Sequence, residues 1–338
     1  MTEGGGREEF IAIVGPTGAG KTALSLALGE MLDGEIISMD SRQVYRGMDI
    51  GTAKATLAER ARIPHHGLDL IDPDQPHSAG QFARYARRRI LDVRSRGRIP
   101  ILVGGTGFFL RSLTHPLFEE PALDPVRRGR LQTFLEGKPS AELERWVAAL
   151  DPARARLAAQ GGPQRMVRTC MIALLTGYRL SDWHARGNEP SPLRGLVVVV
   201  GIPTDVLDRR IDERVSSMER EGLVEEVRAL LDAGYRSTHP GMSGVGYREV
   251  ADHVGGRATL EEALERTRLA TRQYARRQRT WFRRQLPPGS IEVDGTRPIM
   301  ELARGIAAEW ERRGGLAGHR PDTRGGSGRR SGERALTG

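Results

Sequence analysis

A phosphate-binding loop constrains this chain more than any other segment. Residues 15–22 read GPTGAGKT and satisfy the full G-x-x-x-x-G-K-[ST] pattern. An apolar run at 9–14 precedes the loop and a helix-like sequence follows it, which predicts a strand, a loop and a helix in succession. Backbone N–H groups of such a loop form an anion nest, to which Lys21 adds charge and Thr22 a hydroxyl for magnesium. The predicted phosphate site comprises Gly15, Pro16, Thr17, Gly18, Ala19, Gly20, Lys21 and Thr22.

The motif does not identify the phosphate compound. By itself it predicts nucleotide binding, ATP included. P-loop enzymes that act on nucleoside triphosphates usually hold magnesium with a second aspartate at the end of another strand. The corresponding run here, 99–103, ends in the sequence GGTG of residues 104–107, which supplies a hydroxyl but no carboxylate. This difference disfavours simple ATP hydrolysis.

Short apolar runs alternate with helical or irregular segments along most of the chain. They lie at 9–14, 35–38, 99–103 and 196–201, which predicts an α/β fold with a doubly wound parallel sheet of the P-loop NTPase type. Amphipathic helices are expected at 205–233, capped by Thr204, and at 260–286. The strand signal disappears in the middle of the chain. We therefore expect a catalytic core over 8–116 and 190–313, an all-helical insert over 117–189 and a disordered Arg/Gly-rich tail over 314–338.

Charge and cysteine content limit the binding partners, the covalent cross-links and the cellular location that we expect. The 338 residues carry a formal net charge of +9, almost entirely from arginine, which favours a polyanionic partner. Cys170 is the only cysteine, so an intrachain disulfide and a cysteine-based zinc cluster are excluded. The amino-terminal segment lacks the features of a signal peptide, and no apolar stretch is long enough to span a bilayer. We expect a cytoplasmic protein without a membrane partner.

Asp40 is the most informative carboxylate. It follows the second apolar run directly, so it should lie at the same carboxyl edge of the sheet as the phosphate loop. A carboxylate there could bind magnesium, act as a general base or cap a turn. By contrast, His65 and His66 are adjacent and would point to opposite faces of a strand, so joint metal binding is not expected.

A row of arginines near the carboxyl terminus predicts contact with nucleic acid. Helical spacing places them on one face, where like charges repel unless a phosphate backbone neutralises them. Trp281, Phe282 and Tyr274 could stack on bases, although core packing is the commoner role of aromatic residues at this spacing. The row consists of Arg268, Arg272, Arg276, Arg279 and Arg283.

Several long motifs resemble those of the tRNA dimethylallyltransferases, also called the IPP transferase family. The resemblance covers about residues 10–284, and the motifs occur in the family's order: GPTGAGKT, DSRQVYRGMDIGTAK, IPHHGLDLIDP, LVGGTGFFL, GVGYREV and TRQYARRQRTWFRR. It implies that the P-loop holds the pyrophosphate of dimethylallyl diphosphate, with Mg²⁺ on Thr22. It also implies an acceptor adenine on the 3′ side of the anticodon.

The resemblance assigns roles at the reaction centre. Asp40 is expected to hydrogen-bond the exocyclic amine of the adenine and to accept its proton, and Thr106 to lie beside the substrate channel. Lys21, Thr22, the P-loop amides and Arg214 are expected to stabilise the departing pyrophosphate. Arg214 lies in the sequence RRIDERV, where the family has a matching pair of arginines. Without the resemblance, a surface arginine would be the default interpretation of this residue.

The resemblance also implies a set of tRNA contacts. They comprise Asp40, Ser41, Arg42, Gln43, Thr106, Arg127, Gln164, Arg165, Arg168, Arg272, Arg276, Arg277, Gln278, Trp281 and Arg283. The chain departs from the family at Phe109, where tyrosine is common, and at residues 161–163 and 169–171 near the insert contact.

The expected function is transfer of a dimethylallyl group to N6 of adenosine 37, in tRNAs that read codons beginning with U. The expected partners are the anticodon stem-loop of tRNA and dimethylallyl diphosphate, and the protein is expected to be a monomer. Two alternatives remain open. A small-molecule P-loop kinase would consume ATP without RNA, and a non-catalytic RNA-binding protein would tolerate loss of the P-loop and of Asp40.

Overall fold

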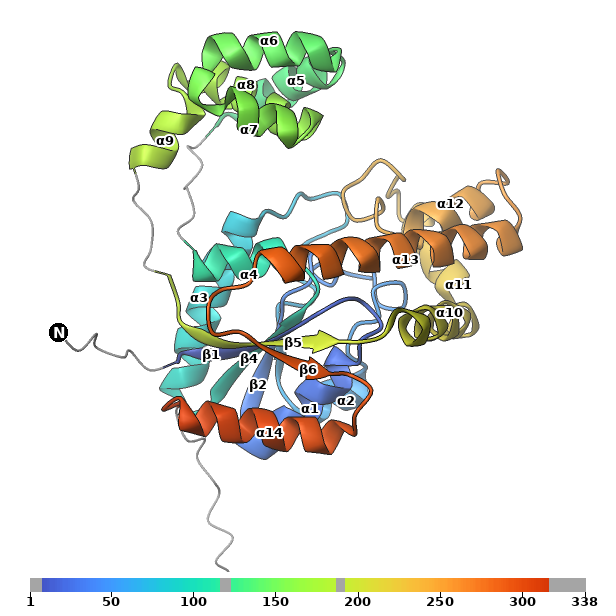
Figure 1. The fold of residues 1–338 in the computed structure, drawn as a ribbon. Coiled ribbons are helices and arrows are strands. Elements are labelled where there is room, and N and C mark those ends of the chain that lie inside the picture. The colour runs from blue at the N-terminus through green and yellow to red at the C-terminus, as the bar shows by residue number, and fades with distance from the viewer. Residues whose placement is uncertain (1–7, 116–122, 187–191, 316–338) are drawn as a thin grey trace, which may run out of the picture. The chain divides into compact units, whose positions relative to one another are not determined.

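A six-stranded parallel sheet forms the centre of the larger part of the molecule (Figure 1). The computed structural model describes residues 8–115, 123–186 and 192–315. The strand order is β3-β2-β4-β1-β5-β6, and every neighbouring pair is parallel. The strands are β1 (Phe10–Val14), β2 (Gly34–Ser38), β3 (His65–His66), β4 (Ile99–Gly104), β5 (Gly195–Gly201) and β6 (Ile291–Asp294).

The predicted α/β class and parallel sheet are confirmed, and the four predicted strands are present. The sequence analysis missed β3 and β6. The first has only two residues, and the second alternates half-buried and exposed side chains at the edge of the sheet. Neither is an uninterrupted apolar run, which was the signal for the other strands.

Helices pack on both sides of the sheet. On one side α1 (Lys21–Leu32) and α14 (Ile299–Arg312) share a core with β1, β4 and β5, in which Leu24, Leu28, Ile306 and Trp310 are buried. Figure 1 shows α13 (Leu260–Arg284) on the other side of the sheet. The remaining helices are α2 (Leu57–Arg62), α3 (Ala79–Ser95), α4 (Gly107–Thr114), α5 (Pro125–Glu136), α6 (Ser140–Leu150), η1 (Pro152–Arg154, a 3-10 turn), α7 (Ala155–Gln160), α8 (Pro163–Thr176), α9 (Leu180–Arg186), α10 (Thr204–Arg220), α11 (Leu223–Asp232) and α12 (Tyr247–Val254).

The expected single helix over 205–233 is wrong, because the chain forms α10 and α11 with a break between them. The break lies at Gly222, whose φ of 101° is in the left-handed region that favours glycine. The cap expected from Thr204 is also wrong. Pro203 is the N-cap residue, and the hydroxyl of Thr204 instead accepts a hydrogen bond from Arg279 Nη1 at 2.5 Å.

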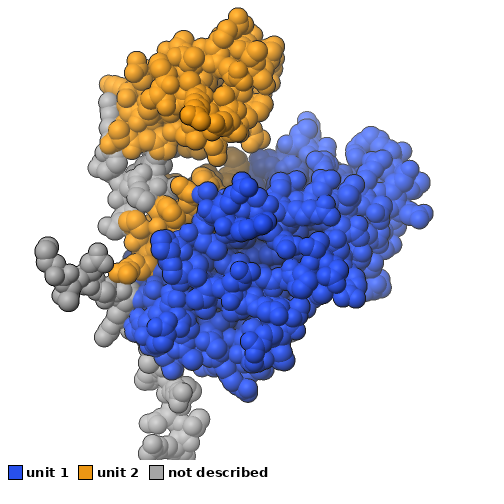
Figure 2. All heavy atoms as spheres, viewed as in Figure 1, with its two compact units in different colours: residues 1–75, 88–105, 195–338 blue, residues 76–87, 106–194 orange. Residues whose placement is uncertain are grey.

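The chain divides into two compact units (Figure 2). The first contains residues 1–75, 88–105 and 195–338, and the second contains 76–87 and 106–194. The second unit is helical and has its own core, formed by residues such as Leu143, Val147, Met166 and Cys170. It begins earlier in the chain than the boundary expected at residue 117. Most of the tail expected to be disordered, from residue 316 onward, lies outside the described residues.

Two further observations bear on the sequence analysis. None of the helices in the described part of the chain has both the length and the apolar character needed to cross a membrane. Phe109, where the family commonly has tyrosine, is 4% exposed and stacks on Phe82 with a centroid separation of 4.3 Å. The ring also meets the imidazole of His77 edge-on at 5.7 Å, so Phe109 is held by two rings of the second unit.

A candidate active site at the carboxyl edge of the sheet

The P-loop lies between β1 and α1, as predicted. Lys21 folds back over the loop, and its Nζ donates to the carbonyl oxygen of Pro16 at 2.7 Å. Among the described residues, no protein acceptor engages the backbone N–H groups of four loop residues, which leaves them available to an anion. These residues are Gly18, Gly20, Lys21 and Thr22.

A cavity of about 630 Å³ opens beside the loop, and all the residues that line it belong to the first compact unit. Its walls come from the P-loop, the segment after β2, the end of β4 and helices α10 and α13. The cavity thus unites segments that are far apart in the sequence. Predicted site residues that line it are Thr17, Lys21, Thr22, Asp40, Ser41, Arg42, Gln43, Arg214, Arg277 and Gln278.

Positive charge concentrates on the phosphate side of the cavity. Burial lowers the pKa of Lys21 to about 8, with a further lowering from the nearby guanidinium of Arg214, while Asp40 acts in the opposite direction. Burial likewise lowers the pKa of Arg214, opposed by Asp40. Glu221 opposes the lowering at Arg214 as Asp40 does. Two cations held close together in a buried site form a site that an anion such as diphosphate would stabilise.

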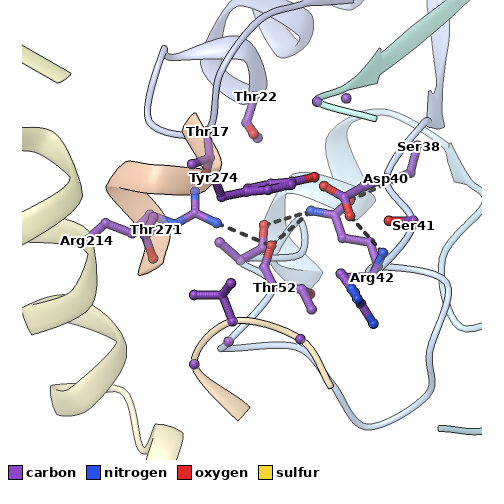
Figure 3. Close-up of a pocket in the computed structure, with 18 of the residues that line it drawn as sticks. Thr17, Thr22, Ser38, Asp40, Ser41, Arg42, Thr52, Arg214, Thr271 and Tyr274 are labelled. Atoms are coloured by element: carbon purple, nitrogen blue, oxygen red, sulfur yellow. Dashed lines mark hydrogen bonds between the residues drawn. The ribbon is translucent and has the colours of Figure 1, made fainter. Parts of the chain in front are cut away.

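Asp40 is the only carboxylate among the described residues that line the cavity. Its Oδ1 accepts the backbone N–H of Arg42 at 2.8 Å, which fixes the orientation of the side chain (Figure 3). The guanidinium of Arg42 donates to the carbonyl oxygen of Pro240 at 2.6 Å. Figure 3 shows the ring of Tyr274 reaching across the cavity toward Asp40.

Gln43 and Arg214 tie the walls of the cavity together through Thr52. The amide of Gln43 donates to the carbonyl oxygens of Thr52 and Ala53 at 3.2 and 3.1 Å, and Ser38 Oγ donates to its Oε1. Arg214 Nη2 donates to the same Thr52 oxygen at 3.4 Å. The loop after β2 is therefore fixed to α10.

A carboxylate that the sequence analysis did not single out holds the other end of this loop. Glu226 accepts the backbone N–H groups of Asp49, Ile50 and Gly51 at 2.8 to 3.1 Å. It also accepts the phenol of Tyr247 at 2.6 Å, and burial followed by the charge of Glu226 raises the pKa of that phenol. Only a three-dimensional contact reveals this role, because an acidic residue in the first turn of a helix is an ordinary sequence feature.

The glycine turn after β4 accommodates close packing. A Cβ at Gly104 would overlap with the carbonyl group of Met39, and one at Gly105 would overlap with the side-chain amide of Gln278. The next residue, Thr106, is the N-cap of α4 and belongs to the second compact unit. Its expected position beside the substrate channel stays a prediction.

The arginine row on α13 is only partly free to meet a phosphate backbone, so the expectation of five uncompensated charges is wrong. Arg272 forms an ion pair with Asp212 of α10 at 2.5 Å, and Arg279 donates to Thr204. Arg268 contacts Ser216 and Glu265. The arginines of α13 whose side chains are exposed include Arg276, Arg277 and Arg283. Their contacts with tRNA, like those of Arg272 and the half-buried Trp281, stay predictions.

The predicted tRNA contacts of the insert lie on the surface of the second unit. Gln164, Arg165 and Arg168 are exposed on α8, within one turn of one another, and Arg127 is exposed on α5. Gly161, in the segment where the chain departs from the family, lets the side chain of Arg165 lie over it, since a Cβ there would overlap with Arg165 Cδ.

Comparison with known proteins identifies the family. The model of the IPP transferase family matches residues 43–285. The chain belongs to the IPP transferase family. The family assignment made from the motifs is therefore confirmed.

Relatives of this IPP transferase match it over most of their length. The tRNA dimethylallyltransferase of Geobacter metallireducens is 45% identical over 291 residues, which is 86% of this chain and 94% of the relative. That of Roseiflexus is 41% identical over 302 residues, 89% of this chain and 98% of the relative.

Solved structures agree with the fold of this IPP transferase. The tRNA isopentenylpyrophosphate transferase of Bacillus halodurans has a TM-score of 0.66 at 35% identity, covering 91% of this chain and 98% of that one. A eukaryotic dimethylallyltransferase described as acting on tRNA has a TM-score of 0.73 at 28% identity, covering 86% of this chain and 74% of that one.

The cavity of this IPP transferase fits a magnesium ion that is held mainly by a ligand. Mg²⁺ usually binds one or two protein groups and completes its shell with phosphate oxygens and water. Within the described chain no cluster of three or more His, Cys, Asp or Glu residues could hold a metal. The hydroxyl of Thr22, exposed at the start of α1, is the group that could contribute to such a shell.

Proposed function

We propose that this protein transfers the dimethylallyl group of dimethylallyl diphosphate to N6 of adenosine 37 in tRNA. The expected acceptors are tRNAs that read codons beginning with U, and the products are N6-(dimethylallyl)adenosine and diphosphate. One observation carries the proposal: in a member of the IPP transferase family, an anion-binding P-loop and a single oriented carboxylate face the same cavity.

The reaction breaks the bond between C1 of the dimethylallyl group and the diphosphate oxygen and forms a bond between C1 and N6. Lys21, the four available P-loop amides and Arg214 stabilise the negative charge that develops on the departing diphosphate. When bound, Mg²⁺ would neutralise part of that charge, with Thr22 as its protein ligand.

Asp40 supports the acceptor side of the reaction. Because the Arg42 amide donates to Oδ1, the carboxylate is oriented before the substrate arrives. Its Oδ2 then accepts a hydrogen bond from the N6 amine of the adenine, and takes a proton from N6 as the new bond to C1 forms. The adenine must leave its stack to reach this carboxylate, which costs little in an anticodon loop. Ser41, Arg42 and Gln43 adjoin Asp40 in the same wall and are proposed to contact the flipped nucleotide.

Most of the remaining proposed contacts are exposed and lie on α13 or on the insert. Exposed residues of α13 and of the insert would bind the phosphate backbone of the anticodon stem-loop. Since tRNA is the acceptor, we expect the protein to act in the cytoplasm. We also expect the protein to be a monomer.

Purified protein incubated with unmodified tRNA, magnesium and radiolabelled dimethylallyl diphosphate tests the proposal. We expect label in the tRNA, confined to the position next to the anticodon. A parallel reaction contains labelled ATP and no prenyl donor. ATP turnover without label transfer would overturn the proposal in favour of a P-loop kinase. Tight tRNA binding without either reaction would favour a non-catalytic RNA-binding protein.

A further inference from the structure

Gln278 connects helix α13 to the phosphate loop from the interior of the protein. Its side chain is buried, with 6% exposed, although its neighbours Arg276 and Arg277 are exposed. Oε1 accepts the backbone N–H of Thr17 at 2.9 Å, and Nε2 donates to the carbonyl oxygen of Gly105 at 2.9 Å. Both ends of the carboxamide are therefore engaged by backbone groups of the donor site.

The orientation of this carboxamide follows from its partners. A backbone N–H can only donate and a backbone carbonyl can only accept, so the oxygen must face Thr17 and the nitrogen must face Gly105. The negative end of the amide dipole is thus directed at the first half of the P-loop. A phosphate oxygen brought to the Thr17 amide would meet a carbonyl oxygen that already occupies it.

This arrangement divides the P-loop into two parts. Gly18, Gly20, Lys21 and Thr22 keep N–H groups without a protein acceptor in the described chain, whereas the Thr17 amide has one. In P-loops that hold triphosphates, the lysine reaches the last phosphates of the chain. Here Lys21 Nζ donates a hydrogen bond to the carbonyl oxygen of Pro16. The terminal phosphate of a bound triphosphate would therefore lie next to Pro16 and Thr17.

We propose that Gln278 is a positioning residue that adapts the P-loop to two phosphates rather than three. It occupies the Thr17 amide, closes that end of the loop and holds the glycine turn of β4 against it. This inference rests on the proposed function, because it explains how a P-loop of common sequence would select a diphosphate donor. It also predicts that Gln278 acts on the donor, although the sequence places it among residues expected to contact tRNA.

Calorimetric titration with inorganic pyrophosphate and with tripolyphosphate tests the proposal, each in the presence of magnesium. The variant is Gln278→Met, which keeps the length of the side chain and removes both hydrogen bonds. We expect the wild-type protein to bind pyrophosphate about tenfold or more tightly than tripolyphosphate. In the variant this preference should fall to about twofold or less, while the Kd for tRNA stays within about twofold.

A second variant reaches the same contact from the other side. In Gly105→Ala the added Cβ displaces the Gln278 amide without changing Gln278 itself, so the preference should fall in the same way. It replaces the first variant if Gln278→Met does not fold. Gln132→Met, at a half-buried glutamine of α5 outside the cavity, is the matched control and should leave both titrations unchanged.

An unchanged preference for pyrophosphate in the folded variants would overturn the proposal. So would a loss of tRNA affinity with normal pyrophosphate binding, which would make Gln278 a tRNA contact instead. The proposed function is judged separately by prenyl transfer in the wild-type protein. A wild-type protein that prefers pyrophosphate but transfers nothing would leave the inference about Gln278 intact and refute the function.

Discussion

Asp40 combines two properties that a general base needs, a defined orientation and a position in the cavity. Asp40→Asn preserves the shape of the side chain and its acceptor for the Arg42 amide, so the fold of the loop should persist. We expect kcat to fall by about 10²–10⁴, typical of the loss of a general base, and tRNA affinity to stay within a few fold. Single-turnover transfer and filter binding measure the two quantities. An unchanged rate would remove Asp40 from the mechanism.

Lys21 is expected to make donor binding dependent on pH. Its pKa is lowered to about 8, so the amine is charged below that pH and becomes neutral above it. Since kcat/KM reports ionisation of the free enzyme, kcat/KM for dimethylallyl diphosphate should decline above about pH 8. Burial of the amine is the main cause of the lowered value, and Arg214 adds to it.

Lys21→Arg provides the control for this pH profile. A guanidinium stays charged throughout the accessible range, so the decline above about pH 8 should disappear even if the absolute rate is lower. A decline at the same pH in the variant would show that another group is responsible.

At the scale of elements, α13 carries two kinds of arginine that the structure distinguishes. Arg276 and Arg283 are exposed, whereas Arg272 is held by Asp212. We expect Arg276→Ala with Arg283→Ala to weaken tRNA binding and to reduce the slope of log K against log salt by about 0.7–0.9 per lost phosphate contact. Binding titrations between low and high salt give this slope. Arg272→Ala is the comparison, and an equal change of slope would contradict the distinction.

The sequence predicted the strands and helices whose signal is local. The P-loop and the four apolar runs appear where they were expected, because each is a continuous pattern. The break at Gly222 was missed, since a glycine between two helical patterns is also tolerated inside one helix. The arginine row was misjudged in part because Asp212, the counter-charge of Arg272, lies on a different helix. Glu265, which pairs with Arg268, lies on α13 itself and was overlooked.

In the candidate site, too, local motifs were predicted and contacts between distant segments were missed. Motifs brought Asp40, Lys21 and Arg214 to attention, and the cavity unites them. The roles of Glu226 and Gln278 depend on which backbone groups they meet, and these lie more than 170 residues away in sequence. Neither residue spacing nor periodicity predicts contacts of this kind. Gln278 was therefore identified only as part of a family motif, and its contact with the P-loop was not predicted.

At the scale of the whole molecule, donor binding and part of the RNA binding are expected to reside in separate units. All residues that line the cavity belong to the first unit, and the insert forms its own core. Arg165→Ala with Arg168→Ala should therefore raise the KM for tRNA about tenfold or more while leaving pyrophosphate binding unchanged. Steady-state kinetics and calorimetry measure the two effects.

The control for this pair of substitutions uses arginines elsewhere on the insert. Arg145 and Arg156 are exposed on α6 and α7, so Arg145→Ala with Arg156→Ala removes the same formal charge from a different surface. Equal losses of tRNA affinity in both double variants would indicate a general effect of charge rather than a defined contact.

The hydrogen bond between Thr17 and Gln278 spans 261 residues of sequence. Since a chain is synthesised from its amino terminus, the P-loop leaves the ribosome long before its partner on α13 exists. Glu226 likewise follows the loop that it holds by 175 residues or more. A nascent chain therefore has the phosphate motif early but completes its donor pocket only after α13 has been synthesised. Truncated products that lack α13 would therefore lack the Gln278 contact of the donor pocket, although they would retain the insert.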